Sequence, residues 1–436
     1  MSDGTLRAEN LILVLLVVSG ALACAIRRLQ RRRPDFTIGR AVAVGVALRL
    51  MAVAAINATG SLQAQLRGGD EQTFLSLANV LASTPWGRGL LPHGLYQLQT
   101  VVFAIQLKLG DFSTTALRVT QIGIAMLGII LILAAVNDLA GARPARLAAW
   151  LLAFEPASIF FDSEIHKEPL MILASGLVVF GGTKIWRRLD PAGVLLVGLG
   201  GLIAIETRAY AGWFLVSASV LLLLHAALRR LDRPGRALPI VYAVALTIFL
   251  VTPTLLSITS NKSLQTLNQA QAYTTGAQAA TNSGGPNGDN LALETVDFST
   301  RGAVITNLPK RVFDLIFEPF PWQLQDTSQQ FGVLGSLVAL AALFMLLRYS
   351  WLSRGSVLSL IAPILYPMLF LLIAYSLSSG NAGTGFRYRT HLVVLGAAML
   401  VVLREHVLRA RAERREPVSV PPEVAAQPRG STPLPA

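Results

Sequence analysis

Long apolar runs alternate with short polar segments along most of this chain. Many runs reach the roughly 17–25 residues that an α-helix needs to cross a bilayer, and by this length about eleven spans are expected. A closed barrel would show short strands of alternating polarity instead. We therefore predict an all-α, polytopic transmembrane helical bundle. Its spans are expected at 10–26, 40–57, 114–136, 145–161, 169–185, 192–206, 210–227, 238–257, 331–348, 356–377 and 390–407.

The amino-acid composition is typical of a membrane protein and favours membrane lipids over nucleic acid as partners. Of 436 residues, 53% are hydrophobic and 14% are charged, against about a quarter charged in soluble domains. The net charge is +13, but the arginines stand in short loops beside apolar runs. Topology and contacts with anionic membrane lipids explain that charge more simply than nucleic-acid binding. Cys24 is the single cysteine, so no intrachain disulfide or Cys/His zinc spacing is expected.

The arginine-rich loops fall on one side of the predicted topology. Because cytoplasmic loops of membrane proteins are rich in Lys and Arg, that side is predicted to be cytoplasmic. The protein is then expected in the bacterial inner membrane, with its N-terminus outside and its C-terminus inside. The first run lacks a preceding basic region and is expected to be a retained anchor. The six loops are RRLQRRRPDFTIGR, NDLAGARPAR, WRRLD, LRRLDRPGR, RYSWLSRG and REHVLRARAERR.

The spans and loops divide the chain into six regions. Two outer loops are long, and the second, 258–330, has two parts of different composition. Its first part is small and polar, while NLPKRVFDLIFEPFPWQLQ is amphipathic and predicts an interfacial helix; the loop is either a lid or a simple tether. The Pro-rich tail is expected to be disordered, and no internal repeat is visible. The regions are N-terminal spans 1–57, an outer acidic loop 58–113, a transmembrane core 114–257, the outer loop 258–330, C-terminal spans 331–407 and the tail 408–436.

The first candidate site is the stretch RGGDEQTFLSLANVLAS, which carries Asp70 and Glu71 just beyond the second span. Acidic residues favour the first turn of a helix, so the pair has a purely structural explanation. The functional alternative is a carboxylate that deprotonates an acceptor hydroxyl or holds a divalent cation. The following stretch, 92–110, predicts a helix lying in the interface or a partial re-entry.

The second candidate site is FFDSEIHKEPLM, which ends one apolar run and begins the next. It holds Asp162, Glu164, His166, Lys167 and Glu168. Ionisable groups at such a depth are costly and usually face the protein interior or a water-filled cavity. A hairpin turn needs a few polar residues, but five titratable groups exceed that need. If the segment is helical, the residues at 164, 167 and 168 share a face.

Two further outer turns carry charge. Glu206 and Arg208 lie in IETRAYAGW, and Arg387 and Arg389 lie in GNAGTGFRYRTHL. If the latter stretch is extended, alternation places its two arginines on one side. Arginines offer bidentate donors to phosphate, so together with Lys167 they would build a pyrophosphate pocket at the outer leaflet. Contact with lipid headgroups is the simpler alternative.

These residues, taken in order, resemble a known family. GGDEQTFLSLA is followed by PHGLYQLQTVVFAIQLKLGDFSTTALRVTQ and then by DLAGARPARLAAWLLAFEPASIFFDSEIHKEPLMIL. This order is similar to the integral-membrane glycosyltransferases of the GT-C class, in particular bacterial protein O-mannosyltransferase and aminoarabinose-transferase type enzymes. The resemblance covers about residues 60–230. The C-terminal half matches loosely, through the outer loop and the late arginines.

The resemblance implies transfer of a sugar, with inversion, from a polyprenyl-phosphate donor to a protein, lipid or glycan acceptor on the outer face. Asp70 matches the catalytic carboxylate, and Glu71 would assist it or bind a cation. Lys167, with Arg208, Arg387 or Arg389, would neutralise the donor phosphate. A divalent cation, Mg²⁺ or Mn²⁺, is the candidate cofactor, with Asp70 and Glu164 as its ligands. The remaining substrate-binding candidates are Glu164, His166, Glu168, Glu206, His93 and Tyr96.

Part of the family pattern is missing, and other functions compete with this one. The large soluble C-terminal domain of some relatives is absent, which assigns acceptor recognition to 258–330. A polysaccharide polymerase or ligase would also have about a dozen spans and outer arginines, with its working residues in the late loop. A secondary transporter would carry charge pairs near the midplane and, in many folds, inverted repeats. A structural scaffold would not need the polar outer cluster.

Overall fold

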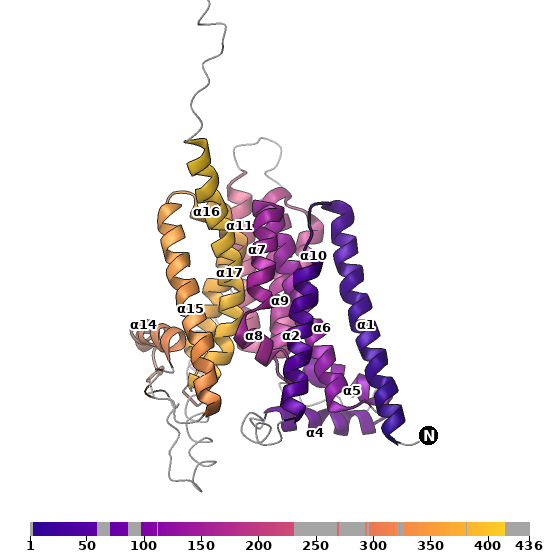
Figure 1. Ribbon diagram of the computed structural model, residues 1–436. Helices are drawn as coiled ribbons and strands as arrows, with labels where there is room; N and C mark the ends of the chain where they lie inside the picture. Colours follow the sequence, from indigo (N-terminus) through magenta and orange to yellow (C-terminus); the bar gives the residue numbers. More distant parts are fainter. Residues whose placement is uncertain are drawn as a thin grey trace, which may run out of the picture.

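The computed structural model is all-helical over the residues that it describes (Figure 1). It contains no strand in these residues, so the predicted all-α class is confirmed. The predicted span 238–257, most of the loop 258–330 and the tail from 415 lie outside the described residues. The described residues are 3–58, 70–85, 97–110, 112–230, 268–269, 293, 296–318, 320, 322, 327–380 and 382–414.

Eight of the described helices are long and apolar enough to cross a membrane. Away from its two ends, a helix pairs every backbone polar group internally, which is why apolar segments of this length adopt it in lipid. Each of the eight overlaps one predicted span. They are α1 (Asp3–Arg32), α2 (Gly39–Ala58), α6 (Thr114–Ala140), α9 (Glu168–Arg188), α11 (Ala209–Leu228), α15 (Thr327–Leu352), α16 (Val357–Ser378) and α17 (Ala382–Glu413).

Two predicted spans take a different form. The span at 192–206 is α10 (Pro191–Thr207), which is apolar but shorter than the eight. The span at 145–161 is wrong as a single helix, because it divides into α7 (Ala142–Ala153) and α8 (Pro156–Phe161). The break lies at Glu155, whose carboxylate accepts from the backbone N–H groups of Ala157 and Ser158 and so caps α8. Pro156 occupies the first turn, where its missing N–H costs nothing.

The bundle is built around α9, which is buried along most of its length and packs against α6 and α10. Glycines allow this close approach. A Cβ on Gly128 of α6 would lie 2.6 Å from the carbonyl oxygen of Ile172 on α9, and Gly176 of α9 in turn faces Gly128. Small residues at such crossings let helix backbones approach closely in membranes. The N-terminal half of α9, which follows the hairpin, is therefore packed closely against α6.

The helices alternate in direction, so their turns collect at two ends (Figure 1). One end, which we call the basic end, carries the turns 33–38, 189–190 and 353–356, with arginines in them or directly beside them, and the C-terminal end of α17. The other, the hairpin end, carries the turn 162–167 and residues 379–380 after α16. The predicted separation of arginine-rich loops from the acidic and histidine-containing hairpin is present in the fold.

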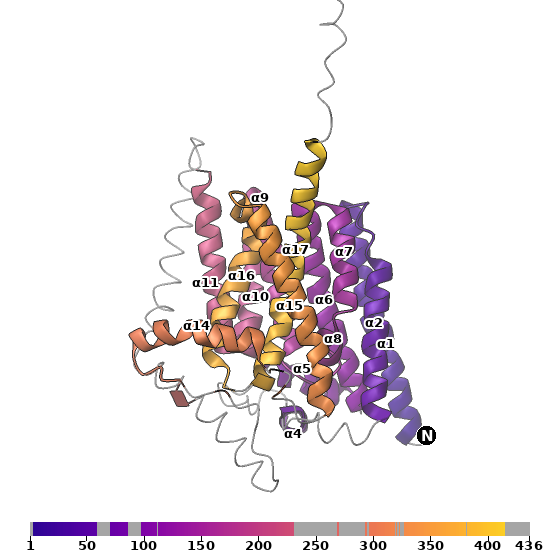
Figure 2. The ribbon, with the colours of Figure 1, turned by 60° about the vertical axis from the view of Figure 1, so that its left-hand side comes forward.

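Three helices outside the set of spans lie near the hairpin end. Helix α4 (Asp70–Ser83) packs against α5 (Gln97–Leu109), which is the helix predicted in the stretch 92–110. Helix α14 (Arg301–Phe317) runs across the direction of the spans (Figure 2). The side chain of Ile305 on α14 is 73% exposed and that of Phe313 is 49% exposed. Exposed apolar residues on a transverse amphipathic helix are typical of a helix at a membrane surface.

Candidate functional site

Ionisable side chains are concentrated and buried towards the hairpin end. Burying a charge is costly unless it is paired and hydrogen-bonded, so a layer of this kind needs internal partners. We call this set the charged layer. Its members are all less than 9% exposed: Arg49, Glu71, Arg118, Glu155, Asp162, Glu164, His166, Glu168, Arg208, Arg389 and His391.

The second candidate site, the hairpin within FFDSEIHKEPLM, has no regular secondary structure from Asp162 to Lys167. Glu164, Lys167 and Glu168 would share one face only in a helical segment, and that condition is not met, because α9 begins at Glu168. The Nε2 atom of His166 lies 2.7 Å from Oε2 of Glu164. Gln99 of α5 donates to the backbone carbonyl of His166 at 2.7 Å, which fixes the turn from outside. Bends supply these contacts because side chains two residues apart would diverge on a helix.

The Glu168 carboxylate pairs with Arg208 from the turn between α10 and α11. Oε1 of Glu168 and Nη2 of Arg208 are 2.6 Å apart, and both side chains are buried. The guanidinium of Arg208 also lies 4.5 Å from the centroid of the Tyr388 ring, a favourable cation–π geometry. Oε2 of Glu168 and Nη1 of Arg208 have no hydrogen-bond partner among the described residues. Glu206, predicted beside them, is exposed and outside this group.

A second set of contacts at Glu168 was missed by sequence reasoning. Nε2 of His391 lies 3.3 Å from the backbone carbonyl of Glu168, and Nδ1 of His391 lies 3.0 Å from the hydroxyl of Tyr375. A carbonyl can only accept, so Nε2 carries the proton and Nδ1 accepts from the tyrosine. Tyr375 stacks on Tyr388 at 4.5 Å. The signal in the sequence was a histidine two residues after Arg389, inside a span.

The two late arginines have different neighbours. Because their stretch is helical and belongs to α17, they do not share a side as an extended strand would place them. Nη1 of Arg387 lies 3.5 Å from Nδ1 of His166. Arg389 donates to the hydroxyl of Ser336 at 3.0 Å and to the backbone carbonyl of Glu318. Both partners of Arg389 are neutral, and no carboxylate among the described residues pairs with it.

The acidic pair of the first outer loop lies at the start of α4. Asp70 is the first residue of α4, and its side chain lies outside the described part of the chain. Glu71 is buried, and its Oε1 lies 2.9 Å from Nη2 of Arg118. Arg118 in turn donates to Asn57 at 2.6 Å, so this pair ties α4 to α6 and α2. His93 and Tyr96 lie outside the described residues.

Arg49 joins the hairpin to α2. Its Nε donates to Oδ2 of Asp162 at 2.8 Å, and the backbone carbonyl of Arg49 accepts from the hydroxyl of Ser163. Burial raises the pKa of Asp162 to about 6, against the opposing effect of the Arg49 guanidinium. Sequence reasoning missed Arg49 and Arg118. Their signal was an arginine inside each of two apolar runs, where a charge is costly and usually faces the bundle interior.

Lys167, the predicted phosphate contact, is the last residue of the hairpin before α9. Its Nζ lies 5.7 Å from the centroid of the Phe74 ring on α4. The side chain is half-buried. The hairpin and the helix that begins at Asp70 are therefore adjacent.

The predicted pair of metal ligands, Asp70 and Glu164, stays a prediction, because the side chain of Asp70 lies outside the described part of the chain. The described residues contain no group of three or more His, Cys, Asp or Glu side chains that could hold a metal ion. Glu164 is instead engaged by His166. Since Mg²⁺ binds through several oxygen ligands, the described part of the chain does not provide the cage.

Comparison with known proteins adds no relative. No family model matches the chain, and no curated protein or solved structure matches it either. Function is therefore inferred from the residues and their geometry.

Proposed function

We propose that the protein is a GT-C type integral-membrane glycosyltransferase. It moves a sugar, with inversion, from a polyprenyl-phosphate donor to an acceptor on the outer face of the bacterial inner membrane, in the assembly of cell-envelope glycans. The observation that carries the proposal is the charged layer. Arginines and carboxylates are buried together at one end of an apolar bundle, beside the helix that starts at Asp70. The bilayer brings a lipid-linked donor to that level.

The donor phosphate is assigned to the basic side chains of the layer. Arg208 has an unused buried donor at Nη1, and Arg389 has one at Nε. Arg389 also lacks a carboxylate partner among the described residues, so a ligand anion would compensate its buried charge. Arginine donors suit phosphate because they can contact two of its oxygens at once. Arg387 and Lys167 complete the set from α17 and the hairpin.

The chemistry requires a base on the side opposite the leaving phosphate. Asp70 takes the proton of the acceptor hydroxyl; the acceptor oxygen forms a bond to the anomeric carbon as the bond from that carbon to the phosphate oxygen breaks. The basic residues stabilise the charge that develops on the departing lipid phosphate. Glu71, held by Arg118, positions the start of α4. A requirement for Mg²⁺ or Mn²⁺ is a separate prediction, tested by measuring sugar transfer with and without EDTA.

The experiment is an assay of labelled polyprenyl-phosphate sugar in proteoliposomes, with lipid phosphate release and sugar transfer both followed. Asp70→Asn is expected to abolish transfer while leaving the thermal stability unchanged. Glu71→Gln is expected to lower stability, because it leaves Arg118 buried without its partner. Asp35→Asn, in an exposed turn at the basic end, is the matched control. Full transfer by Asp70→Asn would overturn the assignment of the base.

An envelope polysaccharide polymerase or ligase is the second candidate, favoured by the placement of Arg389 in the charged layer and of Arg387 beside His166. Activity that survives Asp70→Asn but is lost in Arg387→Ala would favour that enzyme. A secondary transporter is the third candidate. Counterflow of a substrate in proteoliposomes, with no lipid-linked sugar consumed, would reject the glycosyltransferase proposal.

A further inference from the structure

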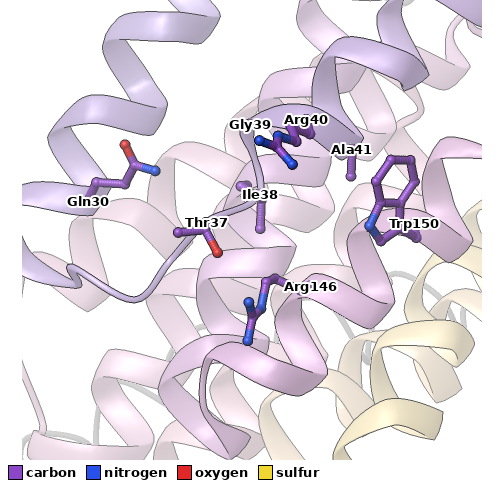
Figure 3. A pocket seen from close by; sticks show the side chains of 8 residues that line it. All are labelled: Gln30, Thr37, Ile38, Gly39, Arg40, Ala41, Arg146 and Trp150. Atoms are coloured by element: carbon purple, nitrogen blue, oxygen red, sulfur yellow. The ribbon is translucent and has the colours of Figure 1, made fainter.

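A cleft of about 490 Å³ lies at the basic end, remote along the bundle from the charged layer. Figure 3 shows it between the α1–α2 turn, the first turn of α2 and α7. Arg40 and Arg146 line it, together with Trp150, Gln30 and Thr37. The proposed glycosyl transfer makes no use of this cleft.

Positive charge in the cleft is not compensated by the protein. Neither Arg40 nor Arg146 forms an ion pair or a hydrogen bond with any residue in the described part of the chain. Asp138, an acidic residue at the same end, is already engaged by Arg33 at 2.5 Å and by Arg187 at 3.9 Å. Two guanidinium groups in one cleft repel each other unless an anion lies between them.

The backbone adds to this positive potential. Gly39 and Arg40 belong to the first turn of α2, where N–H groups have no partner within the helix. The residue before the helix is Ile38, whose side chain carries no oxygen to cap them. The positive end of the helix dipole therefore faces the same cleft as the two arginines.

The outer face of α7 has the polarity profile of one membrane leaflet. Arg146, Trp150 and Phe154 are spaced four residues apart, so each lies about 6 Å further along the helix on one face. Trp150 is 40% exposed and Phe154 is 57% exposed, and their rings stack at 6.0 Å. Arg146 would lie at the level of the lipid headgroups, Trp150 at the membrane interface and Phe154 at the level of the acyl chains.

We infer that this cleft binds an anionic phospholipid, with the phosphodiester between Arg40 and Arg146, the interfacial region against Trp150 and an acyl chain along Phe154. Inorganic phosphate would share the headgroup chemistry but would make no use of the aromatic stripe. The occupant assigned here is therefore a lipid of the surrounding leaflet. The site fixes the α1–α2 turn against α7 in an anionic membrane.

Native mass spectrometry of the full-length protein tests this inference, with dioleoyl phosphatidylglycerol and dioleoyl phosphatidylcholine as probes. Wild-type protein is expected to retain phosphatidylglycerol in preference. Arg40→Gln combined with Arg146→Gln is expected to weaken retention roughly 10- to 30-fold. The corresponding double lysine variant keeps the charge and is expected to keep most of the binding. Arg354→Gln is the matched control, because Arg354 is exposed beside Trp351 in another turn of the basic end.

The same samples separate a lipid from a free anion. Thermal unfolding of delipidated protein is expected to shift upward with phosphatidylglycerol and to stay constant with inorganic phosphate at the same concentration. Equal retention of both lipids by the wild type, unchanged retention by the double glutamine variant, or a shift produced by phosphate alone would each overturn the inference. None of these results depends on glycosyl transfer.

Discussion

The carboxylate of Glu168 at the start of α9 lies 2.6 Å from the guanidinium of Arg208, forty residues later in the chain. Both side chains are buried, and the aromatic ring of Tyr388 from α17 covers the arginine at 4.5 Å. The pair joins three parts of the chain that the sequence separates widely. It is the centre of the charged layer, because His391, which is hydrogen-bonded to Tyr375, also contacts the backbone carbonyl of Glu168.

Breaking this pair is expected to destabilise the protein strongly. Glu168→Gln leaves Arg208 buried without its counter-charge, which typically costs about 3–5 kcal/mol. The measurement is thermal or denaturant unfolding in detergent, followed by tryptophan fluorescence. The matched control is Asp190→Asn, in the part-exposed pair of Asp190 with Lys184 at 3.4 Å, where about 0–1 kcal/mol is expected. Equal stability of the two variants would contradict this role.

Arg389 is expected to behave in the opposite way. Its partners are a hydroxyl and a backbone carbonyl, so replacing the cation with Gln removes a buried charge that no carboxylate among the described residues compensates. Arg389→Gln should leave the free energy of unfolding unchanged or raised, while raising the KM for a polyprenyl-phosphate donor about tenfold or more. Arg208→Gln, which breaks a salt bridge, should lower stability. If Arg389→Gln instead lowers stability and leaves KM intact, its role is structural.

Part of this arrangement could be predicted from the sequence and part could not. The long apolar runs predicted the spans. The excess of charge in the hairpin predicted buried ionisable side chains at Glu164, His166 and Glu168. The ion-pair partners of the buried charges were not predictable, because hydropathy does not show which side of each helix faces the bundle interior. The pairing of Glu71 with Arg118 depends on which face of α6 points inward. The break at Glu155 also escaped length counting, because one capping carboxylate divides an otherwise apolar run.

The stability of the hairpin is expected to depend on pH through Asp162. Burial raises its pKa from 3.8 to about 6. Between these values the folded protein binds a proton that the unfolded chain has released, so this group's contribution to stability falls as the pH rises through the window. One proton gives a slope of at most about 1.4 kcal/mol per pH unit.

Asp162→Asn removes that titration and isolates it from the other carboxylates. The difference in free energy of unfolding between wild type and variant should decrease from pH 3.8 to about 6 and then become level. Unfolding curves at half-unit pH steps in one detergent provide the measurement. A difference that is constant over this range would show that Asp162 does not titrate there.

Close packing of α6 on α9 gives a prediction independent of charge. A Cβ on Gly128 would lie 2.6 Å from backbone atoms of Ile172 and Leu173, so a helix must move to accept it. Gly128→Ala is expected to cost about 1–3 kcal/mol. Gly198→Ala on α10 is the control, since nothing lies within 4 Å of its Cβ position and alanine is the better helix former. Detergent melts compare the two, and a stable Gly128→Ala would show that the helices are further apart.

The most direct test of the proposed glycosyl transfer is an experimental structure of the protein in a nanodisc with a bound polyprenyl phosphate. We expect the phosphate at the hairpin end, within hydrogen-bond distance of Arg208 and of Arg387 or Arg389, with Asp70 on the side that the anomeric carbon would occupy. A polyprenyl phosphate bound at the basic end, or bound without contact to any of these arginines, would contradict the account.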